Sequence, residues 1–146
     1  MARPRLSLQI QIEPGAGRLP ADRPQLRRWA AAALESDARL VMRFVGESEG
    51  RELNHRFRGR NQPTNVLTFD YEVEPMVVAD IVFCMPVVRR EARAQGKTQR
   101  DHLAHLVVHG VLHAHGHDHG NDADAHRMEA REVAILRRFG IDDPYA

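Results

Sequence analysis

Five histidines gather in one short stretch of the chain, HGVLHAHGHDH at residues 109–119. His109 and His113 are four residues apart, so on a helix their imidazoles lie on one face and can bind one metal ion. Gly116 follows three residues later, and glycine readily adopts the left-handed conformation that ends a helix. The chain can then turn back and bring His119 to the same ion. We therefore predict a metal site formed by His109, His113 and His119.

Three histidine ligands satisfy a tetrahedral zinc ion and leave its fourth position for water. A structural zinc site is normally closed by four protein ligands, and the single cysteine, Cys84, lies in a distant apolar run that we assign to the core. The pattern thus predicts one catalytic Zn²⁺ per chain, which lowers the pKa of a bound water to about 7. A histidine-rich metal-storage tract is the alternative. Such tracts lack the apolar frame that surrounds the first two histidines here: Leu106, Val107, Val108, Val111 and Leu112.

The other polar residues of this stretch leave alternatives open. His117 lies two residues nearer than His119 and is a second candidate for the third ligand. We expect His115 to point off the helix face, and His105 to lie one turn before His109, where it could support a ligand. Asp118 either orients a ligand imidazole or caps the turn. The remaining histidines are predicted to be surface residues: His55, His102 and His126.

Two enzyme classes fit such a site. The spacing H-x-x-x-H-x-x-G-x-x-H matches the zinc-binding helix of metzincin proteases and supports His119 over His117. Those proteases carry a glutamate general base directly after the first histidine. Here that position is Gly110, so the usual proton acceptor for peptide hydrolysis is missing. A glycine inside a helix indicates close approach by another backbone or by substrate, or plain helix packing.

A phosphodiester needs a cation near the metal, because its transition state carries more negative charge. Arginine suits phosphate, since its planar fork donates two hydrogen bonds. Arg58 and Arg60 are the best candidates within the basic segment 51–60, unless that segment is only a solvated basic face. Thr64 and Asn65, in the adjacent loop 59–65, would either contact the phosphodiester backbone of a substrate or fix the loop.

Hydrophobic periodicity predicts the elements that position these residues. We expect strands at 6–12, 40–45, 66–72 and 77–84, the last two as a hairpin, and a turn-rich linker at 14–24. Helices are expected at 25–35, 47–57, 86–94, 100–114 and 122–138, with Asn121 capping the last one. The order predicts a single α+β domain over residues 1–146. Its small mixed sheet of about four strands is covered by about five helices, and the metal site lies on a helix of the C-terminal half.

Length and composition agree with that fold. The 146 residues suffice for one core, and 42% are apolar. The single cysteine excludes an intrachain disulfide and fits a cytoplasmic location. No apolar run is long enough to cross a membrane, and we expect no signal peptide. A formal net charge of +1 does not by itself indicate a nucleic-acid-binding protein.

Several blocks together resemble the YbeY-type bacterial endoribonucleases, which are also described as ribosomal RNA maturation factors. The matching blocks cover most of the chain from Glu52 onward: ELNHRFRGRNQPTNVLTFDYE (52–72), ADIVFC (79–84), HLAHLVVHGVLHAHGHDH (102–119), MEAREVAILRRFG (128–140) and DPY (143–145). The histidine block and the LN…R…PTNVL block are specific as a pair. Two departures are small: Ala114 replaces a usual leucine, and His115 stands where an apolar residue is commoner.

The resemblance implies a zinc-dependent endoribonuclease that prefers single-stranded RNA. It implies processing of ribosomal RNA ends, especially the 3′ end of 16S rRNA, and ribosome quality control, with the ribosome or its associated proteins as partners. Carried over by motif position, the zinc ligands are His109, His113 and His119, and the arginine of the catalytic pocket is Arg58. Whether water or the RNA 2′-hydroxyl is the nucleophile stays open. A metzincin-like protease and a non-catalytic ribosome-assembly factor are the alternatives.

Overall fold

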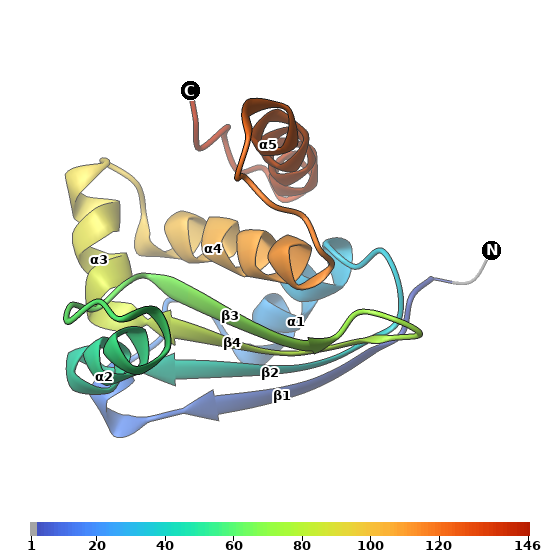
Figure 1. Ribbon diagram of the computed structural model, residues 1–146. Helices are drawn as coiled ribbons and strands as arrows, with labels where there is room; N and C mark the ends of the chain where they lie inside the picture. The colour runs from blue at the N-terminus through green and yellow to red at the C-terminus, as the bar shows by residue number, and fades with distance from the viewer. Residues whose placement is uncertain (1–2) are drawn as a thin grey trace.

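A four-stranded mixed sheet forms the centre of the computed structural model, which describes residues 3–146, and helices lie on both of its faces (Figure 1). The predicted α+β class and the predicted order of elements are confirmed. In chain order the elements are β1 (Leu6–Ile12), a short 3-10 helix (Pro14–Ala16), α1 (Arg23–Ala32), β2 (Ala38–Val45), α2 (Glu47–Arg58), β3 (Val66–Glu72), β4 (Val77–Cys84), α3 (Met85–Ala94), α4 (Gln99–Ala114) and α5 (Asp122–Arg137).

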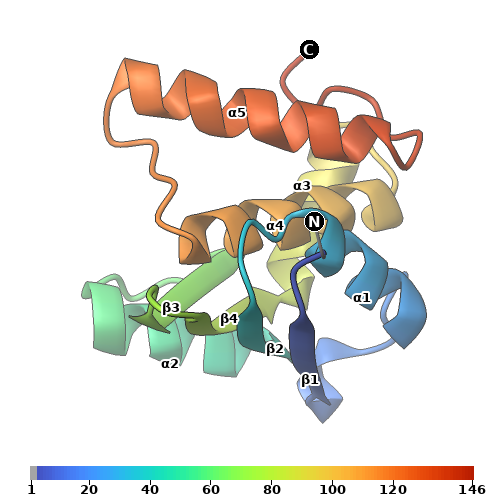
Figure 2. The same cartoon turned by 90° about the vertical axis from the view of Figure 1, so that its right-hand side faces the viewer.

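The strand order across the sheet is β1-β2-β4-β3. β1, β2 and β4 run parallel, whereas β3 pairs with β4 in the antiparallel direction, so the predicted hairpin forms. The hairpin makes β3 an edge strand, and its free edge lies beside the C-terminal end of α4 (Figure 2). The histidine stretch is therefore placed at one margin of the sheet rather than over its middle.

α4 is the most enclosed helix because elements surround it on several sides. α1 and α3 flank it, the sheet lies beneath it, and α5 crosses its outer side (Figures 1 and 2). Alternate residues of β2 and β4, such as Met42 and Ile81, are fully buried towards α4, in keeping with the two-residue period of a strand. The other sheet face carries a smaller cluster in which Leu53 of α2 packs on Leu67 and Val82. Both faces of the sheet are thus covered by helices, and α4 is packed against one of them.

Local signals explain where the elements begin. α1 starts at Arg23, two residues earlier than predicted, because the Asp22 side chain accepts a hydrogen bond from the Gln25 amide and a proline occupies the first turn. It also ends earlier, at Ala32. Asn121 caps α5 as predicted, accepting from the Asp124 amide at 2.9 Å. Cys84 is buried in the core as expected. Among residues 3–146, no helix combines the length and apolar character needed to cross a membrane.

Candidate metal centre

The C-terminal end of α4 has the shape that the histidine spacing predicted. His109 and His113 both lie within the helix, and the helix ends at Ala114. Gly116 has φ of 98°, a conformation that other residues rarely adopt, and its amide donates to the His113 carbonyl. The following segment turns back towards α5 (Figure 2). Gly116 thus reverses the chain direction at the point where His119 must come back towards His109 and His113.

The three predicted ligands come together around this turn. The ring centroid of His119 lies 5.6 Å from that of His109 and 6.4 Å from that of His113. Zn–N bonds of about 2.0–2.1 Å in a tetrahedral site separate ring centroids by roughly 5 Å, so the His113 pair is somewhat wide. The nitrogens of the three rings do not all lie within 4.8 Å of one another. The His119 side chain is 60% exposed, and its nearest charged group is Asp118, 3.8 Å from Nδ1.

His113 has the properties of a neutral imidazole. Burial lowers the pKa of His113 below its ordinary value, and the nearby His109 lowers it further. Its Nδ1 is buried and has no hydrogen-bond partner among the described residues. A neutral ring with a free lone pair is the form in which histidine binds a metal.

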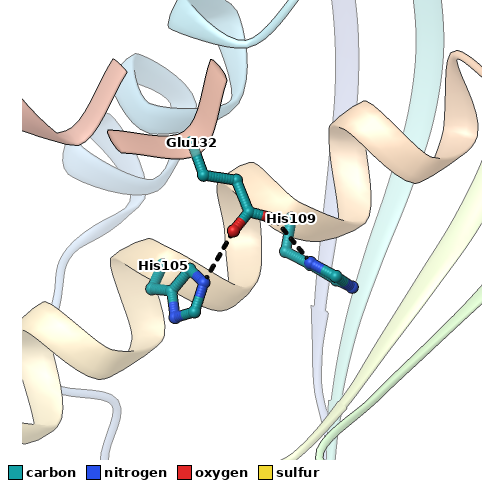
Figure 3. A group of neighbouring side chains, drawn as sticks. All are labelled: His105, His109 and Glu132. Atoms are coloured by element: carbon teal, nitrogen blue, oxygen red, sulfur yellow. Dashed lines mark hydrogen bonds and ion pairs between the residues drawn. The ribbon is translucent and has the colours of Figure 1, made fainter. Parts of the chain in front are cut away.

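A carboxylate that sequence reasoning missed lies behind these rings. Glu132 of α5 is fully buried, and its Oε2 accepts a hydrogen bond from His109 Nδ1 at 2.6 Å (Figure 3). Its Oε1 lies 2.9 Å from His105 Nε2 and also accepts from the Tyr145 hydroxyl. Burial alone would raise the pKa of Glu132, but the hydrogen bonds from His105, His109 and Tyr145 outweigh it and lower the pKa to about 2. The carboxylate is therefore charged at neutral pH.

Two metal-binding arrangements share His109. The ligand atoms of His105, His109 and Glu132 lie within 4.8 Å of one another, so this group could hold a metal ion. The contacts inside it are hydrogen bonds to Glu132, from His105 Nε2 at 2.9 Å and from His109 Nδ1 at 2.6 Å. That leaves His109 Nε2 for the group formed with His113 and His119. Glu132 has the contact that carboxylates typically make behind a metal-bound histidine.

A sequence signal for Glu132 did exist. On α5 the fully or almost fully buried residues Met128, Ile135 and Leu136 form an apolar stripe, and Glu132 lies on that stripe, four residues after Met128. A glutamate on the buried face of a helix requires partners inside the protein. In the structure these partners are His105 and His109 of α4, together with Tyr145.

The other histidines divide between surface and structural positions. His55 and His126 are exposed, as predicted. The prediction for His102 was wrong: it is buried, and its Nε2 lies 2.9 Å from the Glu91 carboxylate of α3, a partner that only the tertiary fold supplies. His117 Nε2 lies 2.9 Å from both carboxylate oxygens of Glu35. His115 contacts the same residue: its Nε2 lies 3.4 Å from the backbone amide nitrogen of Glu35.

Arg58 is the last residue of α2, and its side chain is exposed. Within residues 3–146 its side chain makes no hydrogen bond or ion pair. The loop that follows is fixed at both ends. Asn54 of α2 donates to the Gln62 carbonyl at 2.7 Å, and Asn65 donates to Glu91 at 3.0 Å. Of the two roles considered for Asn65, fixing the loop is therefore the one with an observed contact.

Gly110 faces away from the histidines and into the core. A Cβ added there would lie 2.8 Å from Ile81 Cγ2 and 3.6 Å from Val66 Cγ2. Of the explanations considered for this glycine, helix packing against the sheet is the one that the contacts support. A glutamate at this position would enter the apolar core instead of reaching the histidine cluster.

Comparisons with known proteins identify the family of the chain. The family model for "Endoribonuclease YbeY" matches residues 21–140. A protein of that name from Methylibium petroleiphilum is 52% identical over 145 residues, covering 99% of this chain and 97% of the relative. Another from Thiobacillus denitrificans is 52% identical and covers 97% of each chain. The solution structure of TM1509 from Thermotoga maritima superimposes with a TM-score of 0.64 at 28% identity, over 89% of this chain and 87% of the other. The resemblance inferred from the sequence is confirmed, and the chain belongs to the endoribonuclease YbeY family.

Proposed function

We propose that this protein is a zinc-dependent endoribonuclease that prefers single-stranded RNA. It acts in the cytoplasm on ribosomal RNA, including maturation of the 16S rRNA 3′ end, and in ribosome quality control. Membership in a family named for endoribonuclease activity supports the reaction class. The observation that carries the proposal is the convergence of His109, His113 and His119 where α4 ends.

The residues present suit a zinc ion. The Nδ1 of His109 is engaged by Glu132, which leaves Nε2 free, and burial keeps His113 neutral. His119 lies on an exposed turn and can adjust its ring. When bound, the zinc would supply an open coordination position that activates a water or polarises a phosphate oxygen.

The other steps fall to side chains of the chain itself. Arg58 binds the scissile phosphate through two hydrogen bonds. Its positive charge stabilises the transition state more than the bound substrate, because negative charge builds up there. The fixed loop 59–65 holds the end of α2, and with it Arg58, in place. Single-stranded RNA lies between the basic segment 51–60 and the C-terminal end of α4.

A protease is poorly supported. The position that carries the general base in metzincins is Gly110 here, so that carboxylate is missing, and a Cβ at this position would lie 2.8 Å from Ile81 Cγ2. Parallel assays on RNA and on casein separate the two activities. Cleavage of casein with no cleavage of RNA would reject the nuclease proposal.

The decisive experiment is an end-mapped digest of a defined ribosomal RNA fragment by the purified protein. We expect discrete internal cuts in single-stranded regions, loss of cutting with a chelator, and recovery with about one zinc ion per chain. Cutting that persists in the fully metal-free protein would overturn the zinc dependence. Products ending in a 2′,3′-cyclic phosphate would assign the attack to the RNA 2′-hydroxyl instead of water.

A complementation experiment tests the non-catalytic alternative. A pure assembly factor needs its RNA-binding arginines but not its metal ligands. We expect variants of His113 to fail in ribosomal RNA maturation as severely as variants of Arg58. Full maturation with a folded His113→Ala protein would favour the assembly-factor role.

A further inference from the structure

We propose that Glu132 is a positioning residue for the metal centre and that Tyr145, in the segment after α5, holds Glu132 in place. The proposal rests on the assignment of His109 as a metal ligand. In this arrangement the carboxylate fixes the His109 ring with Nδ1 protonated and Nε2 directed to the ion. It gives a role to the C-terminal DPY segment, for which the sequence offered only a family resemblance.

The first observation is the burial of a charge. Glu132 is fully buried on the face of α5 that packs against α4. A carboxylate without water is costly unless its oxygens accept hydrogen bonds. Among the described residues its side-chain contacts are with His105, His109 and Tyr145. A packing role alone would be served better by an apolar residue, as at the neighbouring position Met128.

The second observation is that the two carboxylate oxygens of Glu132 have different hydrogen-bond partners. Oε2 accepts from His109 alone, at 2.6 Å, whereas Oε1 lies 2.9 Å from His105 Nε2 (Figure 3). Oε1 also accepts from the Tyr145 hydroxyl. The two contacts at Oε1 prevent the carboxyl group from rotating about its own axis. Oε2 is therefore directed at one ring nitrogen. A carboxylate only accepts, so His109 Nδ1 must carry the proton, and in the neutral ring Nε2 then carries the lone pair.

The third observation concerns the C-terminal segment, which is fastened to the body of the protein. Lys97 donates to the Pro144 carbonyl at 3.1 Å, and the Tyr145 amide donates to the Asp143 side chain at 2.8 Å. Tyr145 is 46% exposed, yet its hydroxyl reaches the fully buried carboxylate. The last residues of the chain thus complete the support of a histidine that lies more than thirty positions earlier.

Three variants test the proposal through zinc affinity, measured by competition with a chromophoric chelator. Glu132→Gln preserves the shape but replaces one accepting oxygen by a donor, and we expect zinc to bind about 10- to 100-fold more weakly. Tyr145→Phe removes only the hydroxyl, and we expect a smaller loss of several-fold. Tyr71→Phe is the matched control, because the Tyr71 hydroxyl also donates to a carboxylate, Asp80, on the opposite face of the sheet. It should leave zinc affinity unchanged.

A second readout follows the His109 ring directly. In ¹⁵N-labelled metal-free protein, the histidine nitrogen spectrum should show His109 with its proton on Nδ1. In Glu132→Gln that signal should shift towards a mixture of tautomers, with the amide spectrum showing that the protein remains folded. If zinc affinity and the His109 tautomer are unchanged in both the Glu132 and Tyr145 variants, the proposal is wrong.

These experiments distinguish a failure of this proposal from a failure of the proposed function. Zinc affinity and tautomer are measured without RNA, so a protein that fails to cut RNA but shows these effects would reject only the nuclease assignment. His113→Ala distinguishes the competing ligand group. Unchanged zinc affinity in that variant would place the ion among His105, His109 and Glu132, and would overturn the positioning role.

Discussion

Gly110 of α4 lies so close to Ile81 of β4 that one additional methyl group would come within 2.8 Å of the isoleucine Cγ2. Only glycine lets the helix approach the sheet at this distance. His109 directly precedes Gly110. The distance between α4 and the sheet at Gly110 therefore also determines how far His109 lies from the edge strand β3.

Substituting Gly110 by alanine should destabilise the protein. The added methyl overpacks a fully buried site, which typically costs about 1–3 kcal/mol, and the better helix propensity of alanine returns at most about 1 kcal/mol. We expect a net loss of about 1–2 kcal/mol in the free energy of unfolding, measured by urea denaturation. Ile81→Ala removes Cγ2 and with it the overlap. The double variant should therefore lose less unfolding free energy than the two single variants lose together. Strict additivity would show that the contact is not the cause.

The choice of third ligand leads to a comparison between two histidines on one loop. His119→Ala should weaken zinc binding by at least about 100-fold, since one of three protein ligands is lost. His117→Ala is the matched control, because His117 is already engaged by Glu35 at 2.9 Å. It should retain a stoichiometry near one ion per chain. The reverse result, measured by metal analysis and chelator competition, would exchange the two assignments.

The role of Arg58 predicts a graded loss of catalysis. Arg58→Ala should lower kcat/KM for RNA cleavage by about 100-fold or more while zinc stays bound, and Arg58→Lys should fall between alanine and wild type because it keeps the charge but not the two-pronged hydrogen bond. Arg93→Ala, at an exposed position on α3, is the control. Equal activity of the alanine variant and wild type would remove Arg58 from the site.

Most of the fold followed from local patterns. β3 and β4 have the predicted bounds, because alternating apolar residues and the intervening turn are encoded within a few positions. The end of α4 was predictable for the same reason: Gly116 marks it in the sequence. The start of α1 was placed too late because the capping role of Asp22 was overlooked.

What escaped prediction depends on contacts between distant segments. His102 looked like a surface residue because its partner, Glu91, lies eleven positions earlier on another helix. Glu132 is twenty-three positions from His109, and Tyr145 is thirteen further on. Hydrophobic periodicity indicates which face of a helix is buried, but the partner of a buried polar group is set by how two helices meet. Spacing singled out the three candidate ligands and His105 one turn before them, whereas the contacts of Glu132 and Tyr145 were missed because they join distant segments.

The pair formed by Glu91 and His102 predicts a dependence of stability on pH. Burial alone would raise the pKa of Glu91, but hydrogen bonds from His102 and Asn65 outweigh it, and the pKa is lowered. In the acid range the unfolded chain therefore binds more protons than the folded protein. The stabilisation by Glu91 is complete above its unfolded pKa of about 4.3 and disappears as the pH falls through the folded value.

Glu91→Gln tests this prediction. At pH 7 the variant should be less stable than wild type by about 1 kcal/mol, since a charge-assisted contact becomes a neutral one. Urea unfolding at pH 3 should show a smaller difference, because wild-type Glu91 is then becoming protonated. Glu72→Gln is the control, as the Glu72 side chain is exposed and makes no hydrogen bond or ion pair within residues 3–146. A difference that stays constant from pH 7 to pH 3 would mean that the charge of Glu91 does not hold α3, α4 and the loop before β3 together.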